Sequence, residues 1–133
     1  MTFEEFNLNA PLRNALEELG YVYPTPIQQS TYPVAMSGRD VIGIAQTGTG
    51  KTLAYLLPIL RKLSYSDQRQ PRVLIVVPTR ELVLQVVDEI KKLTAYASVR
   101  VGGVYGGTNI NKRPNRRILY CMVEYSSCKN SIS

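Results

Sequence analysis

Hydrophobic residues in the first third of the chain recur every three to four positions, which is the spacing of amphipathic helices. Residues 10–19 follow this spacing, with Asn9 placed as an N-cap and Gly20 placed just after the last turn. A second helix is expected over residues 26–36, with Thr25 as its N-cap and a proline at its first position. The pattern therefore predicts two short helices ahead of the first apolar run.

The apolar positions then become continuous, which is typical of strands buried in a sheet. Residues 40–44 predict a short buried strand, and residues 73–77 predict a strand buried on both faces. Helical spacing returns at 53–63 and 82–93, and residues 99–105 predict a further strand. Strands that alternate with helices indicate an α/β fold, with a parallel sheet flanked by helices and right-handed crossovers. In such sheets ligands bind beyond the carboxyl ends of the strands.

Charge is distributed unevenly over the 133 residues, which carry a net charge of +6. Residues 112–133 hold five basic side chains against Glu124 alone, so residues 1–111 carry only +2. A basic chain favours nucleic acid as a partner, but charge gathered in one terminal stretch weakens that inference.

Composition excludes several classes of protein. The chain has no histidine, which rules out mechanisms that need an imidazole, and Cys121 and Cys128 are too few for a disulfide framework or a four-ligand zinc site. No apolar run is long enough to span a bilayer, so no membrane partner is expected. Residues 1–6 are acidic and lack the basic start of a signal peptide, which favours the cytoplasm.

A candidate phosphate-binding loop with the pattern A-x-x-x-x-G-K-T follows the predicted strand 40–44. Its residues are Ala45, Gln46, Thr47, Gly48, Thr49, Gly50, Lys51 and Thr52. The two glycines allow the backbone to bend so that successive N–H groups face one point, where the next helix adds its positive N-terminus. Lys51 supplies a point charge for the outer phosphates, and the Thr52 hydroxyl can ligate Mg²⁺. We therefore expect a nucleotide-binding site here.

The identity of the base is less clear from the residues alone. The guanine-binding pattern Asn-Lys-x-Asp does not occur, because Pro114 stands at the position of the aspartate. Adenine needs a partner that accepts from N6 and donates to N7, and a primary amide does both. Gln28 and Gln29, at the start of the predicted helix 26–36, either supply such an amide or are solvated glutamines on a capped surface helix.

Four ordered motifs resemble those of the DEAD-box RNA helicases, and bacterial RhlE-type members in particular, over about residues 2–111. Residues 20–28, G-Y-V-Y-P-T-P-I-Q, resemble the Q motif of that family, and Phe3 stands at the aromatic position upstream of it. The loop A-Q-T-G-T-G-K-T is similar to motif I in every residue. Motif Ia is matched by P-T-R-E-L at residues 78–82, and the GG element by Gly106 and Gly107.

The resemblance implies a P-loop NTPase with a truncated RecA-like domain that uses ATP and Mg²⁺ and acts on RNA. Gln28 would read the adenine, with Phe3, Tyr23 and Thr25 near the base. The loop would hold the phosphates, with Lys51 and Thr52 at the β- and γ-phosphates and Thr52 at Mg²⁺. The RNA backbone would be contacted, without reading of its sequence, by Pro78, Thr79, Arg80, Gly106 and Gly107.

The expected RNA contact also has a physical argument of its own. Thr79 is a candidate N-cap, so the helix after it would point free N–H groups at a phosphate, and Arg80 would add a charge-assisted hydrogen bond. The alternative is an ordinary helix start in which Arg80 pairs with Glu81 or with solvent.

The Asp-Glu-Ala-Asp sequence, in which the family places its Mg²⁺ carboxylate and the group that orients the attacking water, does not occur. Asp88 and Glu89 lie within helical spacing, so we expect them on a solvated helix face. Two hypotheses follow for the chain. It is either the N-terminal part of an ATP-dependent RNA helicase, with activity in the intact protein, or a module that binds ATP or ADP without turnover.

The resemblance is expected to stop near residue 112. The chain then divides into a Q-motif region (1–38), a partial RecA-like domain (39–111) and a basic tail (112–133). We expect the tail to be a shifted reading frame or an unrelated fusion, and the alternative is a genuine divergent tail in which residues 118–123 pair as a strand. A sheet cut after three or four strands exposes an edge, so self-association is expected, most of all through residues 73–77.

Overall fold

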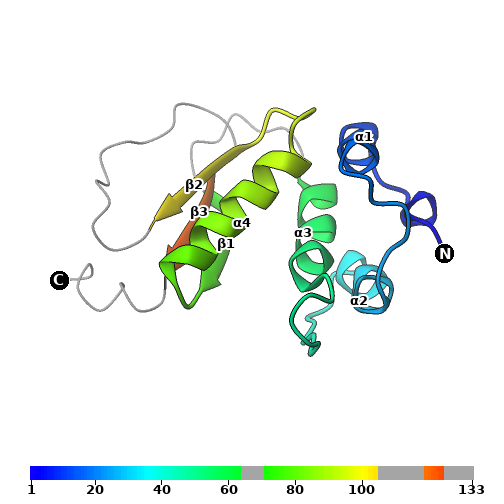
Figure 1. The fold of residues 1–133 in the computed structure, drawn as a ribbon, viewed down its shortest axis with the longest axis horizontal. Coiled ribbons are helices and arrows are strands. Elements are labelled where there is room, and N and C mark those ends of the chain that lie inside the picture. The colour runs from blue at the N-terminus through cyan, green and yellow to red at the C-terminus, as the bar shows by residue number, and fades with distance from the viewer. Residues whose placement is uncertain (64–70, 105–118, 125–133) are drawn as a thin grey trace. The chain divides into compact units, whose positions relative to one another are not determined.

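The computed structural model describes residues 1–63, 71–104 and 119–124. Its elements in chain order are η1 (Phe3–Phe6), α1 (Ala10–Glu18), α2 (Pro26–Met36), α3 (Lys51–Lys62), β1 (Pro71–Val77), α4 (Arg80–Leu93), β2 (Arg100–Val104) and β3 (Leu119–Glu124) (Figure 1). They fall into two compact units, unit 1 (Met1–Ser64) and unit 2 (Tyr65–Ser133). The helical elements that precede β1 belong to unit 1, and the strands with α4 belong to unit 2.

The helices of unit 1 begin close to where the sequence predicts. α1 follows Asn9 at its N-cap, and α2 follows Thr25. Gly20, just after α1, has φ of 76°, a left-handed conformation that glycine adopts without steric cost. The predicted helix 53–63 is confirmed with an earlier start at Lys51. The apolar faces of these helices form the core of unit 1, whose fully buried side chains include Leu16, Leu56 and Leu57.

An aromatic cluster packs the N-terminal residues of unit 1 against α2. The rings of Phe3 and Phe6 meet edge to face with centroids 5.6 Å apart, and Phe6 stacks on Tyr32 at 4.3 Å. The Tyr32 hydroxyl donates a hydrogen bond to the Phe6 carbonyl over 2.9 Å. On the other side of this turn, Arg61 Nε of α3 donates to the Asn7 carbonyl over 2.9 Å. These contacts make η1 part of the core of the unit.

The strand predicted at residues 40–44 does not form in the described structure. Val41 and Gly43 line a cavity with side chains of α2 and α3, whereas Ile42 and Ile44 are 92% and 90% exposed. Val41 is itself 40% exposed and Gly43 is also exposed, and none of the described strands pairs with this segment. The prediction is wrong because an apolar run becomes a buried strand only where neighbouring strands satisfy its backbone.

Unit 2 contains a parallel sheet in which β3 lies between β1 and β2. Ile75, Met122 and Gly103 share one row of its register. α4 packs on the sheet through an apolar stripe whose buried members are Val83, Val86, Ile90 and Leu93. At Gly103 a Cβ would come within 3.1 Å of Val83 Cγ1 and of Val87 Cγ2, so the missing side chain allows α4 to lie close to β2. The predicted parallel sheet is confirmed.

Two further expectations about unit 2 meet different outcomes. β1 confirms the strand at 73–77, but Leu74 and Val76 are 61% and 52% exposed, so the expected burial on both faces is wrong. The reason is that α4 covers the face of Ile75, and no other described helix of unit 2 covers the opposite face. The strand that the sequence left open at 118–123 forms as β3 and provides the centre of the sheet.

Candidate functional site

The candidate phosphate-binding loop bends through two glycines in left-handed conformations. Gly48 and Gly50 have φ of 81° and 84°. Between them, the Thr49 hydroxyl donates a hydrogen bond to the Gln46 carbonyl over 2.6 Å, which closes the turn on itself. α3 begins at Lys51, immediately after the second glycine. Loop and helix thus follow each other as the sequence predicts, although the strand expected before them is missing.

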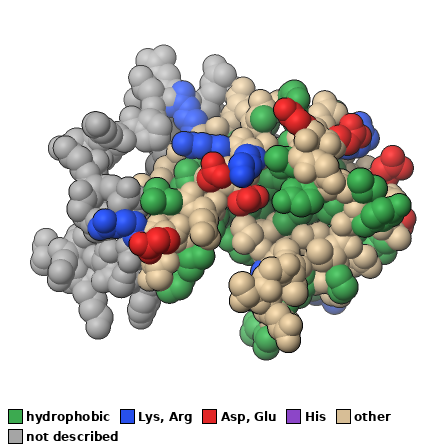
Figure 2. All heavy atoms as spheres, in the orientation of Figure 1, with side chains coloured by type: hydrophobic (Ala, Val, Ile, Leu, Met, Phe, Trp, Pro, Cys, Tyr) green, Lys and Arg blue, Asp and Glu red, His purple; other side chains and the backbone are tan. Residues whose placement is uncertain are grey.

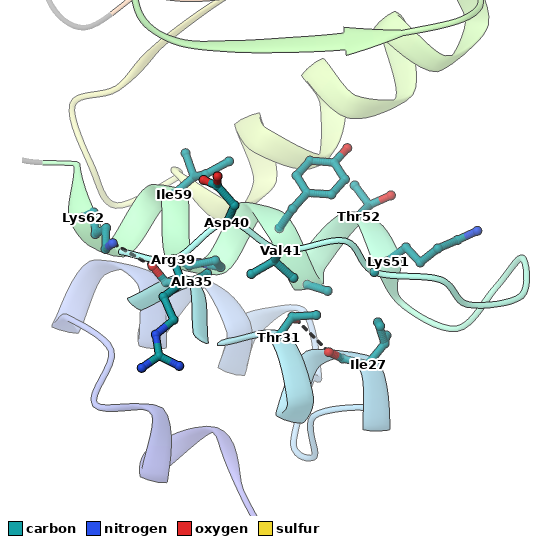
Figure 3. Close-up of a pocket in the computed structure, with 14 residues that line it drawn as sticks. Ile27, Thr31, Ala35, Arg39, Asp40, Val41, Lys51, Thr52, Ile59 and Lys62 are labelled. Carbon is teal, nitrogen blue, oxygen red and sulfur yellow. Dashed lines mark hydrogen bonds between the residues drawn. The ribbon is translucent and has the colours of Figure 1, made fainter. Parts of the chain in front are cut away.

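The N-terminus of α3 presents both of its candidate functional side chains. Lys51 is exposed and Thr52 is half-buried, and both contribute to the wall of a cavity of about 740 Å³ (Figure 3). The Ala54 N–H bonds to the Gly50 carbonyl, so the N–H groups of residues 51–53 precede the first intrahelical bond of α3. The helix itself is anchored by Leu56 and Leu57, which are fully buried. The packing of the helix therefore positions its N-terminus, from which the exposed Lys51 side chain extends.

Gln28 is 3% exposed and is joined to the loop itself. Its Oε1 accepts a hydrogen bond from the Thr25 backbone N–H over 3.0 Å, and its Nε2 donates to the Gly50 carbonyl over 3.1 Å. A Cβ at Gly50 would clash with Gln28 Nε2 and would lie 3.1 Å from Thr25 Oγ1. Gly50 is therefore required here both by its backbone conformation and by the close approach of the glutamine.

The second glutamine has a different role. Gln29 Nε2 donates a hydrogen bond to the Pro24 carbonyl over 2.8 Å, which holds the linker against the start of α2. The interpretation of Gln28 and Gln29 as solvated surface glutamines is therefore wrong, because one is buried and both are hydrogen-bonded to backbone groups. Sequence reasoning missed the Gln28–Gly50 bond, since residues 22 positions apart show no pairing signal in a single sequence.

The other candidate base-binding residues lie apart from one another. Tyr23 is exposed on the linker before α2. Thr25 is half-buried, and its Oγ1 is covered without a hydrogen-bond partner in the part of the chain that the structure describes. Phe3 is buried in the aromatic cluster with Phe6. Thr25 and Gln28 thus reach the loop, whereas Phe3 is used in packing.

A second candidate site lies at the carboxyl end of β1 in unit 2. Pro78, Thr79 and Arg80 are all exposed there. Thr79 is the N-cap of α4, and its Oγ1 accepts a hydrogen bond from the Leu82 backbone N–H over 3.2 Å. The expected cap is confirmed, and Arg80 is the first residue of the helix that it begins. Gly106 and Gly107 lie outside the described residues.

Acidic side chains offer no metal site in residues 1–63 and 71–104, where no three His, Cys, Asp or Glu side chains converge. Asp88 lies on α4 and pairs with Lys92 across one turn at 3.0 Å, with both side chains largely exposed. The expected solvated helix face is confirmed for Asp88, whereas Glu89 is half-buried. Membrane insertion is not indicated either, because none of the described helices has the length and hydrophobicity to cross a bilayer.

The pKa of two tyrosines is raised in unit 1. Burial raises the pKa of Tyr55, which lies one turn along α3 from Thr52 and also lines the cavity. Burial likewise raises the pKa of Tyr32 in the aromatic cluster, although the nearby Arg61 guanidinium opposes the shift. Sequence reasoning gave Tyr55 no role, and its spacing of three residues from Thr52 was the available signal.

Comparison with known sequences shows a match over most of the chain. The sequence model of the DEAD/DEAH box helicases matches residues 25–125, which includes β3 and passes the expected end of the resemblance near residue 112. The "ATP-dependent RNA helicase DRS1" of Yarrowia lipolytica is 45% identical over 112 residues, covering 82% of this chain and 15% of that protein. The "DEAD-box ATP-dependent RNA helicase CshA" of Streptococcus pneumoniae is 44% identical over 113 residues, covering 85% of this chain and 21% of that protein. The chain spans about a fifth or less of these relatives.

Solved structures show a similar backbone. The RNA helicase Prp28 from Chaetomium thermophilum, bound to ADP, aligns with a TM-score of 0.78 at 36% identity over 90% of this chain and 31% of that chain. A hypothetical ATP-dependent RNA helicase from Sulfolobus tokodaii aligns with a TM-score of 0.77 at 31% identity, over 92% of this chain and 35% of that chain. These likenesses confirm the predicted fold class, an α/β RecA-like architecture with a parallel sheet.

Proposed function

This chain belongs to the DEAD/DEAH box helicase family, and we propose that it is the ATP-binding portion of an ATP-dependent RNA helicase. Unwinding or remodelling of RNA would belong to the intact protein. One observation supports this proposal above all: the Gln28 carboxamide donates a hydrogen bond to Gly50, so the candidate base reader is joined to the candidate phosphate loop. The proposal therefore rests on a single assembled site in unit 1.

ATP would be held through its phosphates by the loop and the start of α3. The left-handed turns at Gly48 and Gly50 and the free N–H groups of the helix N-terminus fit an anion, and Lys51 is exposed beside them. Thr52 would ligate Mg²⁺, which, when bound, neutralises charge between the β- and γ-phosphates. Lys51 and Thr52 are thus the proposed residues at the reacting phosphates, with Ala45, Gln46, Thr47 and Thr49 completing the loop.

Recognition of adenine by Gln28 would require an exchange of partners. The base needs one donor and one acceptor from the carboxamide, and both are used inside the protein by Gly50 and Thr25. We propose that adenine replaces these two bonds while Tyr23 and Thr25 lie near the ring. Phe3 would act through the packing of η1, because its own side chain is buried.

RNA would bind at the start of α4 without reading of its sequence. Thr79 orders the first turn, Arg80 adds a positive charge, and Pro78 begins the bend after β1. Unit 2 is also the basic part of the chain, with eleven basic and five acidic residues between positions 65 and 133. Gly106 and Gly107 complete this proposed RNA surface by family resemblance alone.

A second candidate function is a nucleotide-binding module that turns nothing over. The sequence holds no Asp-Glu-Ala-Asp motif, and the described residues hold no cluster of carboxylates that would replace it. Binding of ATP or ADP without hydrolysis would follow, because the loop supplies binding while the carboxylates that orient Mg²⁺ and water are missing.

The two candidates are separated by measuring binding and turnover on the same preparation. We expect the chain to bind ATP in the presence of Mg²⁺ and to show no RNA-stimulated ATPase, and we expect Lys51→Ala to lose the binding while circular dichroism stays unchanged. Turnover that disappears in Lys51→Ala would favour the helicase activity in this chain itself. A folded chain that binds no ATP would overturn both candidates.

Three narrower proposals accompany this function. The exposed Leu74 and Val76 on the edge strand β1 would drive self-association. Sedimentation should show larger species for the parent chain and fewer of them for Leu74→Lys.

Kinship with bacterial RhlE-type members would be tested by the full reading frame around this sequence. The cytoplasm would be the compartment, to be checked by fractionation.

A further inference from the structure

The two ends of the sheet in unit 2 differ in charge. β1, β3 and β2 run parallel, so all three begin at one end, the amino end of the sheet. At Gly103, near the end of β2, an added Cβ would lie 3.1 Å from Val83, near the start of α4, so this helix runs back along the sheet and ends at the amino end (Figure 1). In the last turn of α4 and the first two positions of each strand, the charged residues are all basic: Arg72, Lys91, Lys92 and Arg100.

The carboxyl end of the sheet is less basic in the part of unit 2 that the structure describes. Arg80 begins α4 there, but Glu81 follows it and Glu124 is the last residue of β3. Among the described residues, the amino end therefore attracts a polyanion more strongly, although the RNA contact proposed above lies at the other end.

The positive charge at the amino end is only partly compensated. Lys92 pairs with Asp88 at 3.0 Å. Lys91 is exposed and Arg100 is half-buried, and neither forms an ion pair within residues 1–63, 71–104 and 119–124. Nη1 of Arg100 is covered and has no hydrogen-bond partner in the same ranges. Attraction to the negative helix end explains the lysines in the last turn of α4, but it does not explain an arginine at the start of β2.

An exposed aromatic side chain belongs to the same end of the sheet. Tyr96 is 52% exposed and lies between α4 and β2. Its turn is held in place, because the Ala97 N–H bonds to the Thr94 carbonyl over 3.0 Å and the buried Thr94 hydroxyl donates to the Ile90 carbonyl over 2.7 Å. Tyr96 is four residues from Arg100, so their Cα atoms lie within about 14 Å of each other. An exposed ring beside cations is the combination on which a base stacks while its phosphates are held.

We propose that the amino end of this sheet binds single-stranded RNA, with one base stacked on Tyr96 and the adjacent phosphates at Lys91 and Arg100. The choice of RNA as the polymer rests on the proposed function. The site itself is a second contact, separated by about 20 Å, the length of β1, from the end at which Arg80 lies. Stacking and charge together provide affinity without reading of the sequence.

The stack is tested by fluorescence anisotropy of a labelled oligouridylate with the full chain, so that residues 112–133 contribute equally to every variant. We expect Tyr96→Ala to weaken binding about tenfold and Tyr96→Phe to retain it. Tyr21→Ala removes another exposed tyrosine, in unit 1, and should bind as the parent does. An oligomer of the same length that lacks its bases should bind Tyr96→Ala and the parent equally, because no stack is lost.

The phosphate contacts are tested by the salt dependence of the same binding. Lys91→Gln and Arg100→Gln should each lower the slope of log affinity against log salt by about one. Arg13→Gln, an exposed arginine of unit 1, is the control and should keep the slope of the parent. Lys91 is exposed, so its variant remains informative if Arg100→Gln does not fold.

Three outcomes would overturn the proposal. The first is Tyr96→Ala that binds oligouridylate as tightly as Tyr21→Ala. The second is a parent slope in both the Lys91 and the Arg100 variants while Arg80→Gln lowers it, a result that leaves the proposed RNA binding at α4 intact. The third is a folded chain that binds no RNA, which would also overturn the RNA part of the proposed function.

Discussion

Unit 1 and unit 2 differ in how they would attract an anionic ligand. Residues 1–64 hold five basic and five acidic residues, whereas residues 65–133 hold eleven basic and five acidic. Figure 2 shows acidic side chains over the part of unit 1 where η1 and α1 lie. The phosphate-binding loop is thus set in a unit without net charge, so its attraction for phosphate comes from local backbone geometry and one lysine. Unit 2 carries the whole excess of basic residues, but most of that excess lies in residues 112–133, so the attraction for a polyanion comes mainly from that terminal stretch.

The units also differ in the range of the contacts that hold them. Unit 1 is built from helices, whose hydrogen bonds are local, and is closed by a few side-chain bonds such as Arg61 to Asn7. Unit 2 depends on strands that lie far apart in the sequence, because β3 sits between β1 and β2. Local signals therefore specify the nucleotide-binding unit more completely than they specify the sheet.

The largest expected effect tests whether the units fold independently. Leu57→Ala in α3 and Ile90→Ala in α4 each remove a fully buried side chain and should cost about 2–5 kcal/mol in the unit that contains it. Hydrogen exchange resolved by segment should show faster exchange in α1–α3 for the first variant and in α4 and the sheet for the second. Faster exchange in both units from either variant would mean that they unfold together.

The next effect separates two contributions to the stability of the loop: the left-handed backbone conformation of its glycines and the contact of Gly50 with Gln28. Gly48→Ala and Gly50→Ala both place a side chain at a left-handed φ, but the space beside Gly48 is open while Gly50 faces Gln28. We expect Gly48→Ala to destabilise unit 1 by about 1–2 kcal/mol and Gly50→Ala by about 1–3 kcal/mol more. Chemical denaturation followed by segment-specific hydrogen exchange measures the difference. Equal costs would show that the Gln28 contact contributes nothing.

A smaller effect concerns how an arginine from each unit contributes to the salt dependence of RNA binding. Binding of single-stranded RNA should weaken steeply with salt, and Arg80→Gln should lower the slope of log affinity against log salt by about one. Arg13→Gln, an exposed arginine of α1, is the matched control and should leave that slope unchanged. Fluorescence anisotropy at several salt concentrations provides the measurement. A slope that changes equally in both variants would remove the special role of α4.

The smallest expected effect is at the ion pair on α4. Asp88→Asn breaks the 3.0 Å contact with Lys92 between two largely exposed side chains, so unit 2 should lose less than about 0.5 kcal/mol. Thermal unfolding at low and high salt checks this value, which should fall further as salt rises. A loss above that limit would indicate a structural role that the exposure of the pair does not suggest.

Sequence reasoning succeeded where the determining contacts are local. The caps at Asn9, Thr25 and Thr79 and the helices after them were predictable because N-cap residues and apolar spacing act within a few positions. The same local rules located the glycine turns and the start of α3, which form the phosphate-binding half of the candidate site.

It failed where a segment depends on partners far away in the chain. Residues 40–44 have the composition of a strand, yet composition does not provide the neighbouring strand that a ladder needs. The prediction that β1 is buried on both faces failed for the same reason, because the residues of a strand do not specify whether another element covers its second face. The hydrogen bond from Gln28 to Gly50 is also non-local. The sequence therefore predicted the two motifs but not the contact between them.

The exposure of residues 41–44 has a consequence for ligand affinity. The phosphate-binding loop is held by the buried helix α3 that follows it and by the hydrogen bond from Gln28 to Gly50, whereas in the segment before it Val41 lines the cavity and Gly43 lies near side chains of α2. Fixing a loosely held residue costs about 1–2 kcal/mol of conformational entropy. A nucleotide that orders this segment must overcome that entropic cost. The cost is already met if another molecule with an apolar surface has bound to Ile42 and Ile44. Nucleotide affinity would then rise when that molecule binds, although the two molecules need not be in contact.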